Sequence, residues 1–216
     1  MQTRGLFIVF EGIEGSGKTT QSALLAEYCE QKGVSHMRTR EPGGTQLSQR
    51  IRSIVLDPDT KISNKAEVLL YLADRAEHVA QVLEPALSQG RVVLCDRYEA
   101  SLFAYQCGGR GMDKDACVYI NQFARGTVIP DFTFWLDVDP YVGLARVRAR
   151  GNGLDRIELE EMAFHQRVRQ GYVEYFMEIG ERCLQVDASC DSESIHAIVV
   201  SEFERILTEV PREMSP

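Results

Sequence analysis

The sequence predicts an α/β fold: a doubly wound parallel sheet of five strands with helices on both faces. Three observations carry this prediction. Five short, mostly apolar segments alternate with helical segments along the 216 residues, and such alternation builds a parallel sheet whose crossovers cover both faces. The segment 91–96 is almost wholly apolar, as strands buried on both faces are. Three strands are followed by loops rich in glycine and charge, where ligands of such sheets bind.

The strands are expected at regular intervals along the chain. The first is the apolar run from Leu6 to Phe10, which is followed directly by a glycine-rich loop. The other four expected strands span residues 34–40, 91–96, 131–137 and 183–187.

Helices are expected between the strands, and glycine, proline and aspartate mark where they end. Gly33 ends the first helix, Asp57-Pro58-Asp59 follows the second, and Gly108 to Gly111 separate two later helices. Pro85 is expected to bend the third helix near its end. Residues 211–216 are expected to fray. The expected helical ranges are 18–31, 46–56, 64–88, two within 100–125, 140–150, 155–180 and a last one ending near Glu209.

Length and composition favour one domain, residues 1–216, that neither enters a membrane nor binds nucleic-acid polymers. No linker or repeat divides the chain, and no apolar run approaches the length of a membrane-spanning helix. The net charge of −8 argues against DNA or RNA, which favour basic surfaces. The first strand begins so early that we expect no signal peptide. The six cysteines lack C-x-x-C and zinc spacing, so we expect reduced thiols in a cytoplasmic protein.

The residues after the first strand form the pattern G-x-x-x-x-G-K-T. Its glycines let successive N–H groups face one phosphate cluster, and the following helix points its positive end there. Lys18 can reach the β- and γ-phosphates of a nucleoside triphosphate, and the Thr19 hydroxyl can ligate Mg²⁺. A chance glycine-rich turn is the alternative, which the complete strand–loop–helix context disfavours. The expected triphosphate-binding residues are Gly12, Ile13, Glu14, Gly15, Ser16, Gly17, Lys18, Thr19 and Thr20.

Asp96 and Arg97 end the third strand. A carboxylate at this place is the expected second protein ligand of Mg²⁺, although Asp96 could instead cap the next helix. The phosphate loop upstream favours the metal role. The guanidinium fork of Arg97 matches phosphate oxygens, so Arg97 is a candidate for binding the phosphate of an acceptor.

Arginines surround the glycines near residue 152. We interpret residues 146–157 as a flexible lid that closes over the triphosphate, because closure keeps water from taking the phosphoryl group. Asp155 and Glu158 resemble a capping box that restarts a helix. A solvated charged helix is the alternative. The four arginines are Arg146, Arg148, Arg150 and Arg156. On a helix Arg146 and Arg150 would share a face, whereas Arg148 would point away from it.

No general base is expected at this site. If the acceptor is a phosphate monoester, it is already nucleophilic, and phosphoryl transfer depends on positioning and charge neutralisation rather than on a covalent protein intermediate. The four histidines are scattered along the chain, and we predict no catalytic role for them.

Five segments in chain order carry a more specific signal than the phosphate loop alone. They are that loop, T-R-E-P-G-G-T at 39–45, L-A-D-R at 72–75, D-R-Y-x-x-S-x-x-A-Y-Q at 96–106 and L-D-R-I-E at 154–158. Together they resemble the bacterial thymidylate kinase family and cover nearly the whole chain. The resemblance implies a P-loop fold of the nucleoside monophosphate kinase type and transfer of the γ-phosphate of ATP to dTMP. It also implies Mg²⁺ as cofactor and a homodimer.

The resemblance also implies roles at the dTMP site. Tyr71 would stack on the thymine and Arg75 would hydrogen-bond it, and their i,i+4 spacing puts both on one helix face. Core packing is the alternative for Tyr71. Arg97 would hold the dTMP phosphate, and the Glu41–Pro42 bond would be cis. The other implied contacts are Ser101 and Gln106 at the base, Tyr105 at the sugar 2′ position, and Glu14 at the 3′-hydroxyl or the metal.

Gly15 occupies a loop position at which some members of that family carry an arginine. With glycine there, the lid has to supply the positive charge, and Arg150 and Arg156 are the best candidates. The expected catalytic residues are therefore Lys18, Arg97, Arg150, Arg156 and Glu14.

Two other functions are compatible with a phosphate loop. Another nucleoside monophosphate or nucleoside kinase would share the architecture and differ only in the acceptor pocket. A GTPase-type switch would need D-x-x-G and N-K-x-D. The first pattern does not occur, and Asn64 to Glu67 only approaches the second.

Overall fold

Five parallel strands form one sheet in the order β2-β3-β1-β4-β5. The computed structural model describes residues 4–151 and 153–209, so the tail expected to fray lies outside the described residues. All four strand pairs are parallel, which confirms the predicted fold class. The strands are β1 (Phe7–Glu11), β2 (His36–Arg40), β3 (Val92–Asp96), β4 (Phe132–Asp137) and β5 (Cys183–Asp187).

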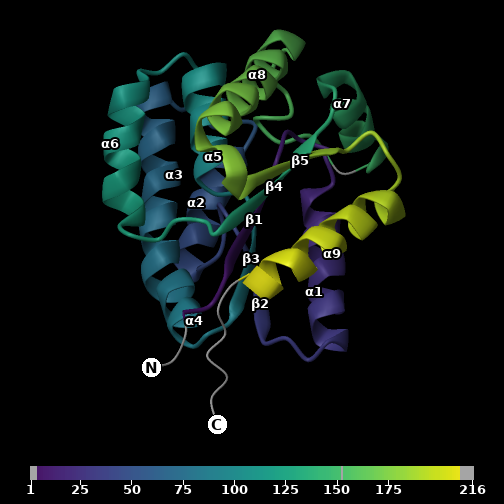
Figure 1. The fold of residues 1–216 in the computed structure, drawn as a ribbon. Helices are drawn as coiled ribbons and strands as arrows, with labels where there is room; N and C mark the ends of the chain where they lie inside the picture. Colours follow the sequence, from purple (N-terminus) through teal and green to yellow (C-terminus); the bar gives the residue numbers. More distant parts are fainter. Residues whose placement is uncertain (1–3, 152, 210–216) are drawn as a thin grey trace.

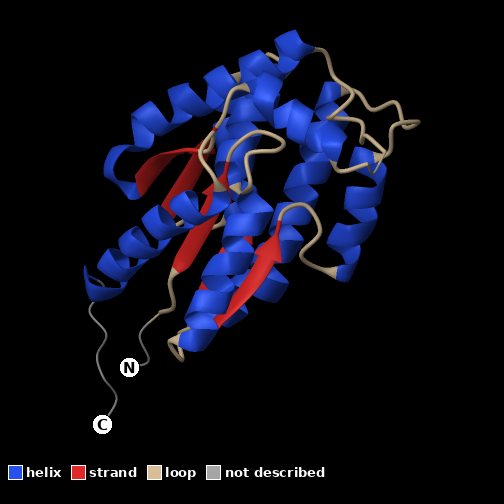
Figure 2. Ribbon diagram, turned by 90° about the vertical axis from the view of Figure 1, so that its right-hand side faces the viewer, coloured by secondary structure: helices blue, strands red, loops and turns tan. Residues whose placement is uncertain are grey.

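Helices cover both faces of the sheet, as Figures 1 and 2 show. On one face lie α1 (Lys18–Gln31) and α9 (Ser192–Glu209), and on the other lie η1 (Val79–Leu83) and α4 (Glu84–Ser88). Successive residues of β1 therefore enter different cores: Ile8 joins the apolar cluster that includes α1 and α9, whereas Phe7 joins the one that includes η1 and α4.

Three helices stand side by side at the edge of the molecule in Figure 1: α2 (Gln46–Leu56), α3 (Asn64–His78) and α6 (Lys114–Arg125). Between β3 and α6 the chain forms α5 (Glu99–Leu102) and the π-helical η2 (Phe103–Gly109). The remaining helical elements are α7 (Pro140–Ala149), α8 (Met162–Ile179) and the short η3 (Gly180–Arg182). Across the residues that the structure describes, no helix is both long and apolar enough to cross a membrane.

The expected helix over residues 64–88 is helical throughout, but its middle differs from the prediction. A π-helical turn, η1, ends at Leu83, two residues before Pro85. Proline has no N–H to donate to the preceding turn, and a wider turn is one way for a helix to pass such a residue.

The helix expected over residues 155–180 is the larger correction, because α8 begins only at Met162. The predicted capping box does form: Asp155 Oδ1 accepts from the Glu158 amide at 2.9 Å, and Glu158 Oε2 accepts from the Asp155 amide at 3.0 Å. It caps a single turn, since the Arg156 amide donates to the Leu56 carbonyl at 3.0 Å and ties this segment to the end of α2.

Candidate active site

A cleft with a cavity volume of about 190 Å³ opens where β1, β2 and β3 end. This is the edge at which ligands of parallel sheets bind. Although the chain carries a net charge of −8, six cationic side chains line this cleft, as many as the six carboxylates there. The sequence analysis did not predict Arg40 and Arg52 as site residues. Arg40 could have been found, because it lies within the segment T-R-E-P-G-G-T. Nothing in the sequence distinguishes Arg52 from other surface arginines. The cationic residues that line the cleft are Lys18, Arg40, Arg52, Arg75, Arg97 and Arg150.

The phosphate loop depends on glycine at Gly15. Its φ is 72°, and a Cβ at this position would lie 2.1 Å from the main-chain oxygen of Gly143 in α7. No side chain fits there unless α7 moves away. Packing of α7 against the loop thus explains why this chain cannot place an arginine at this position.

Lys18 begins α1 and lies over the loop. Its Nζ donates to the Ile13 carbonyl at 2.7 Å and to Ser16 Oγ at 3.2 Å. Burial lowers the pKa of Lys18 to about 8, and Arg97 adds to this effect, while nearby carboxylates including Asp96 oppose it. The N-cap of α1 is Gly17, which has no side chain, so the first N–H groups of the helix are open to an anion.

The predicted magnesium ligands meet in the structure. Thr19 Oγ1 donates to Asp96 Oδ2 at 2.5 Å, and both residues line the cleft. A hydroxyl and a carboxylate are hard oxygen donors that suit Mg²⁺, which takes few protein ligands together with phosphate oxygens and water. The pair therefore fits the ion. Asp96 does not cap α5, whose N-cap is Tyr98.

Arg97 is held rigidly beside the loop. Its φ of 74° lies in the left-handed region that non-glycine residues rarely adopt. Nη1 donates to the Gly12 carbonyl at 3.0 Å, to Ser101 Oγ at 3.1 Å and to the Tyr172 hydroxyl at 3.0 Å, and Nη2 donates to Glu14 Oε1 at 2.9 Å. The strained backbone and these four acceptors, three of which share the two N–H groups of Nη1, give the guanidinium one orientation.

Glu11 and Tyr172 support Arg97, and sequence reasoning missed both. The buried Glu11 carboxylate accepts from the Tyr98 amide at 2.8 Å, from Ser101 Oγ at 2.7 Å and from the Tyr172 hydroxyl at 2.9 Å. Burial raises the pKa of Glu11. A single charge that ends an apolar strand was a usable signal for Glu11. Tyr172 lies within the ordinary apolar pattern of α8, which carries no such signal.

Glu14 lies at the centre of these contacts. Besides pairing with Arg97, it accepts a hydrogen bond from the Tyr105 hydroxyl, and His165 Nδ1 lies 3.5 Å from its Oε2. Burial would raise the pKa of Glu14, but Arg97, His165, Lys18 and Tyr105 together outweigh this effect and hold the pKa well below its usual range. Glu14 is therefore a charged acceptor inside the cleft.

The residues expected at the nucleobase also line the cleft. Tyr71 and Arg75 both line the cleft, in agreement with their i,i+4 spacing on one helix face. The Arg75 guanidinium lies 4.7 Å from the centroid of the Tyr98 ring. Burial raises the pKa of Tyr71, so its hydroxyl stays neutral. Gln106 is buried, and its Nε2 donates to Glu67 Oε1 at 3.1 Å.

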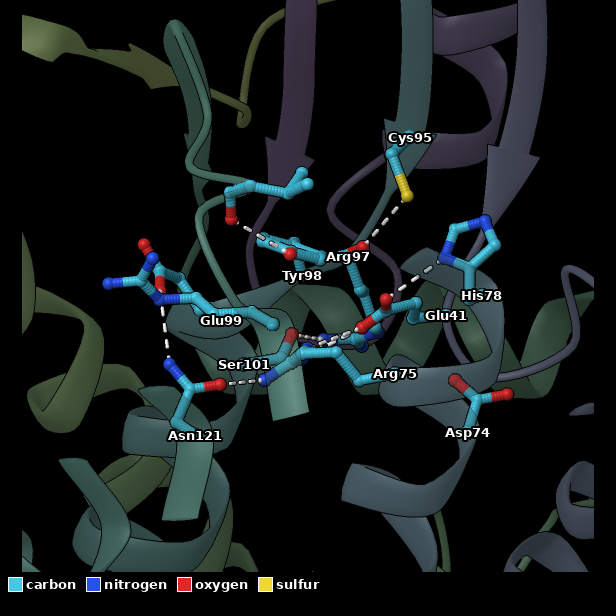
Figure 3. Close-up of polar contacts among 12 residues, drawn as sticks. Glu41, Asp74, Arg75, His78, Cys95, Arg97, Tyr98, Glu99, Ser101 and Asn121 are labelled. Carbon is cyan, nitrogen blue, oxygen red and sulfur yellow. Dashed lines mark hydrogen bonds and ion pairs between the residues drawn. The ribbon is translucent and has the colours of Figure 1, made fainter. Parts of the chain in front are cut away.

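Glu41 organises this part of the cleft (Figure 3). It precedes the cis bond to Pro42, as expected. Its Oε2 accepts from Nε and Nη2 of Arg75 at 2.9 and 2.8 Å, and its Oε1 accepts from Nδ1 of His78 at 2.9 Å. Burial opposes the ionisation of Glu41, but Arg75 and His78 lower its pKa. The carboxylate thus joins the loop after β2 to α3.

The lid arginines have different surroundings. Arg150 is exposed and lines the cleft. Arg146 donates to the Ala188 carbonyl at 2.7 Å, and Arg156 donates to the Val55 carbonyl at 2.8 Å and pairs with Glu67. Neither of these two is among the residues that line the cleft, so Arg150 alone of the expected lid candidates faces it.

A cleft that can hold a triphosphate on a glycine-rich loop and a second phosphate on a neighbouring buried arginine is suited to phosphoryl transfer between small molecules. The fold and the site therefore define a P-loop phosphotransferase of the nucleoside monophosphate kinase type.

Comparison with known proteins shows to which family within this class the chain belongs. A profile described as thymidylate kinase matches residues 10–199. The thymidylate kinase of Nostoc sp. is 48% identical over 197 residues, which cover 90% of this chain and 93% of the relative. That of Gloeobacter violaceus is 45% identical over 205 residues, 94% of this chain and 97% of the relative. This chain belongs to the thymidylate kinase family and is therefore an enzyme, which disfavours the GTPase-type switch.

Proposed function

We propose that this cleft transfers the γ-phosphoryl group of ATP to dTMP and yields dTDP. Membership of the thymidylate kinase family supplies the reaction. One observation carries the assignment of the two substrates: Lys18 and Arg97 line the same cleft, yet Lys18 lies over the phosphate loop while Arg97 is fixed beside it by Glu14 and Tyr172. Two cationic groups on one cleft suit two phosphate groups that meet in line.

Each expected site residue has a role in this proposal. The loop from Gly12 to Thr20 binds the phosphates of ATP through its N–H groups, and Lys18 adds a positive charge. Thr19 and Asp96 would hold Mg²⁺, which neutralises charge on the phosphate oxygens when bound. The acceptor residues are Arg97 for the dTMP phosphate, Glu14 and Tyr105 at the sugar, and Tyr71, Arg75, Ser101 and Gln106 around the thymine.

We also propose that residues 146–157 act as the lid of a single domain. Arg146 ties one end of this segment to the loop after β5, and Arg156 ties the other end to α2 and α3. Arg150 lies between these two attachments and beside Gly151. It is therefore the lid arginine placed to reach the triphosphate, whereas Arg156 would first have to leave Glu67.

We further propose a homodimer that works in the cytoplasm. The neighbouring helices α2, α3 and α6 expose large apolar side chains, and such surfaces suit an interface between two copies. All six cysteines are free thiols, in keeping with a reducing compartment. The exposed apolar residues on these helices are Leu47, Ile54, Leu69, Tyr119 and Phe123.

A panel of acceptors tests the proposed reaction. The purified protein is offered ATP, Mg²⁺ and, in turn, dTMP, dUMP, UMP, CMP and AMP, and ADP release is measured. We expect dTMP to be clearly preferred. Thymine and uracil differ by one methyl group, which an apolar pocket distinguishes by about 1–3 kcal/mol. Faster turnover of another monophosphate would assign the acceptor pocket to that nucleotide instead.

A further inference from the structure

Asn121 joins α6 to the arginine at the nucleobase end of the cleft (Figure 3). Its side chain is only 2% exposed, although it lies on a helix whose Tyr119 and Phe123 are 75% and 89% exposed. Asn121 Oδ1 accepts from Nη1 of Arg75 at 2.6 Å. A residue 46 positions away in the sequence thus contacts the guanidinium that faces the cleft.

The orientation of the Asn121 amide is fixed by its two partners. A guanidinium only donates, so the oxygen of Asn121 has to face Arg75. A carboxylate only accepts, and Nδ2 of Asn121 donates to Glu99 Oε2 at 3.0 Å. The same Glu99 oxygen lies 3.0 Å from Nε of Arg125. Glu99 therefore holds the amide in the one orientation that serves Arg75.

Glu41 alone does not fix the Arg75 guanidinium. The bonds from Nε and from Nη2 both end on one oxygen atom, Glu41 Oε2, while the other oxygen binds His78. Two bonds that converge on one atom act as a pivot. The bond from Nη1 to Asn121 is a second attachment on the other side of the fork, and it stops rotation about that pivot.

We propose that Asn121 is a positioning residue for nucleobase selection: with Glu99 it orients Arg75 so that the free guanidinium N–H groups meet the base of dTMP. The proposal rests on the proposed role of Arg75 at the base. The bonds to Glu41 and Asn121 use three of the five N–H groups of a guanidinium, which leaves two for a ligand. Because these groups only donate, a fixed Arg75 favours a base with a carbonyl oxygen there over one with an amino group.

Exchanging the polar groups between Asn121 and Glu99 tests this proposal. In Asn121→Asp, a carboxylate replaces the amide and meets the Glu99 carboxylate, which disrupts the contact with Arg75. In the double variant Asn121→Asp with Glu99→Gln, the glutamine amide can donate to the aspartate, so the bond between these two side chains and the total charge are restored, while the contact of residue 99 with Arg125 is lost. Asn121→Leu removes the attachment without adding charge, and Gln122→Leu on the exposed side of α6 is the matched control.

We expect Asn121→Asp and Asn121→Leu to raise the KM for dTMP by about 10-fold and to narrow the preference for dTMP over dCMP, with the KM for ATP unchanged. The double variant should recover most of the dTMP affinity, and Gln122→Leu should behave like the native enzyme. If the single variants lower only the melting temperature and leave both dTMP readouts unchanged, or if the double variant shows no recovery, the positioning role is wrong. Failure of the native enzyme to use dTMP would instead overturn the proposed function.

Discussion

The phosphate end and the nucleobase end of the cleft are built in different ways. At the phosphate end, Lys18 bonds to Ile13 and Ser16, which lie within five residues of it. At the nucleobase end, Arg75 bonds to Glu41 and Asn121, 34 and 46 residues away. A local motif carries its own geometry, whereas a site assembled from distant elements depends on how those elements pack. We therefore expect substitutions at the phosphate end to remove a group that acts in the reaction, and substitutions at the nucleobase end to misplace a group that binds the acceptor.

The largest effect is expected from Lys18→Ala, which tests the phosphate end directly. Removing this cation should lower kcat by about 10³-fold or more, because charge that develops during transfer loses a preorganised partner. The melting temperature should stay near the native value. Steady-state kinetics and thermal unfolding measure the two quantities, and near-normal turnover by a folded variant would remove Lys18 from the mechanism.

Arg150→Ala tests whether the lid belongs to the phosphate end. We expect kcat to fall by about 10²-fold with little change in the KM for dTMP, because Arg150 would meet the triphosphate rather than the acceptor. Arg148→Ala is the matched control, since Arg148 is also exposed but is not among the residues that line the cleft. A raised KM for dTMP with unchanged kcat would place Arg150 at the acceptor.

Tyr172→Phe tests how Arg97 is positioned between the phosphate end and the nucleobase end of the cleft. It removes the hydroxyl that bonds to Glu11, Ser101 and Arg97 and keeps the ring. We expect the KM for dTMP to rise by about 10-fold, because one charge-assisted hydrogen bond to Arg97 is lost. Tyr141→Phe, on an exposed tyrosine, is the control. An unchanged KM for dTMP would show that the strained backbone alone positions Arg97.

Asp74→Asn concerns stability at the nucleobase end. Burial, helped by the nearby Glu41, raises the pKa of Asp74 from 3.8 to about 6. The folded state therefore keeps a proton that the unfolded state has lost. The stabilisation from this group is fully present below pH 3.8 and is lost as the pH rises through about 6.

Asparagine cannot titrate, and its amide oxygen can still accept from the Gly43 amide, which Asp74 Oδ1 contacts at 3.0 Å. Between pH 4 and pH 7, the free energy of unfolding of the native protein should therefore fall, relative to that of Asp74→Asn, by at most about 3 kcal/mol. Urea unfolding at several pH values measures this difference, and a constant difference would contradict the raised pKa.

The sequence predicted the local phosphate motif more directly than it predicted contacts between distant residues. Gly12 to Thr19 were predicted as a phosphate-binding loop, because strand, loop and helix signals coincide within a few residues, and Asp96 was predicted as a metal ligand because it ends an apolar strand downstream of that loop. Arg146 and Arg150 show the limit: both belong to one arginine-rich segment, yet one binds the Ala188 carbonyl and the other faces the cleft. The helical pattern puts them on one face and cannot tell which neighbour each one meets.

The amino-acid sequence by itself determined the strand–helix alternation, the phosphate loop and the family, because each is written in short-range patterns of glycine, charge and apolar residues. Only the tertiary structure decided which carboxylate pairs with each buried arginine: Glu14 with Arg97 and Glu41 with Arg75. The physical reason is that a buried charge must find a partner among the groups that packing brings near it, and packing joins residues that the chain separates.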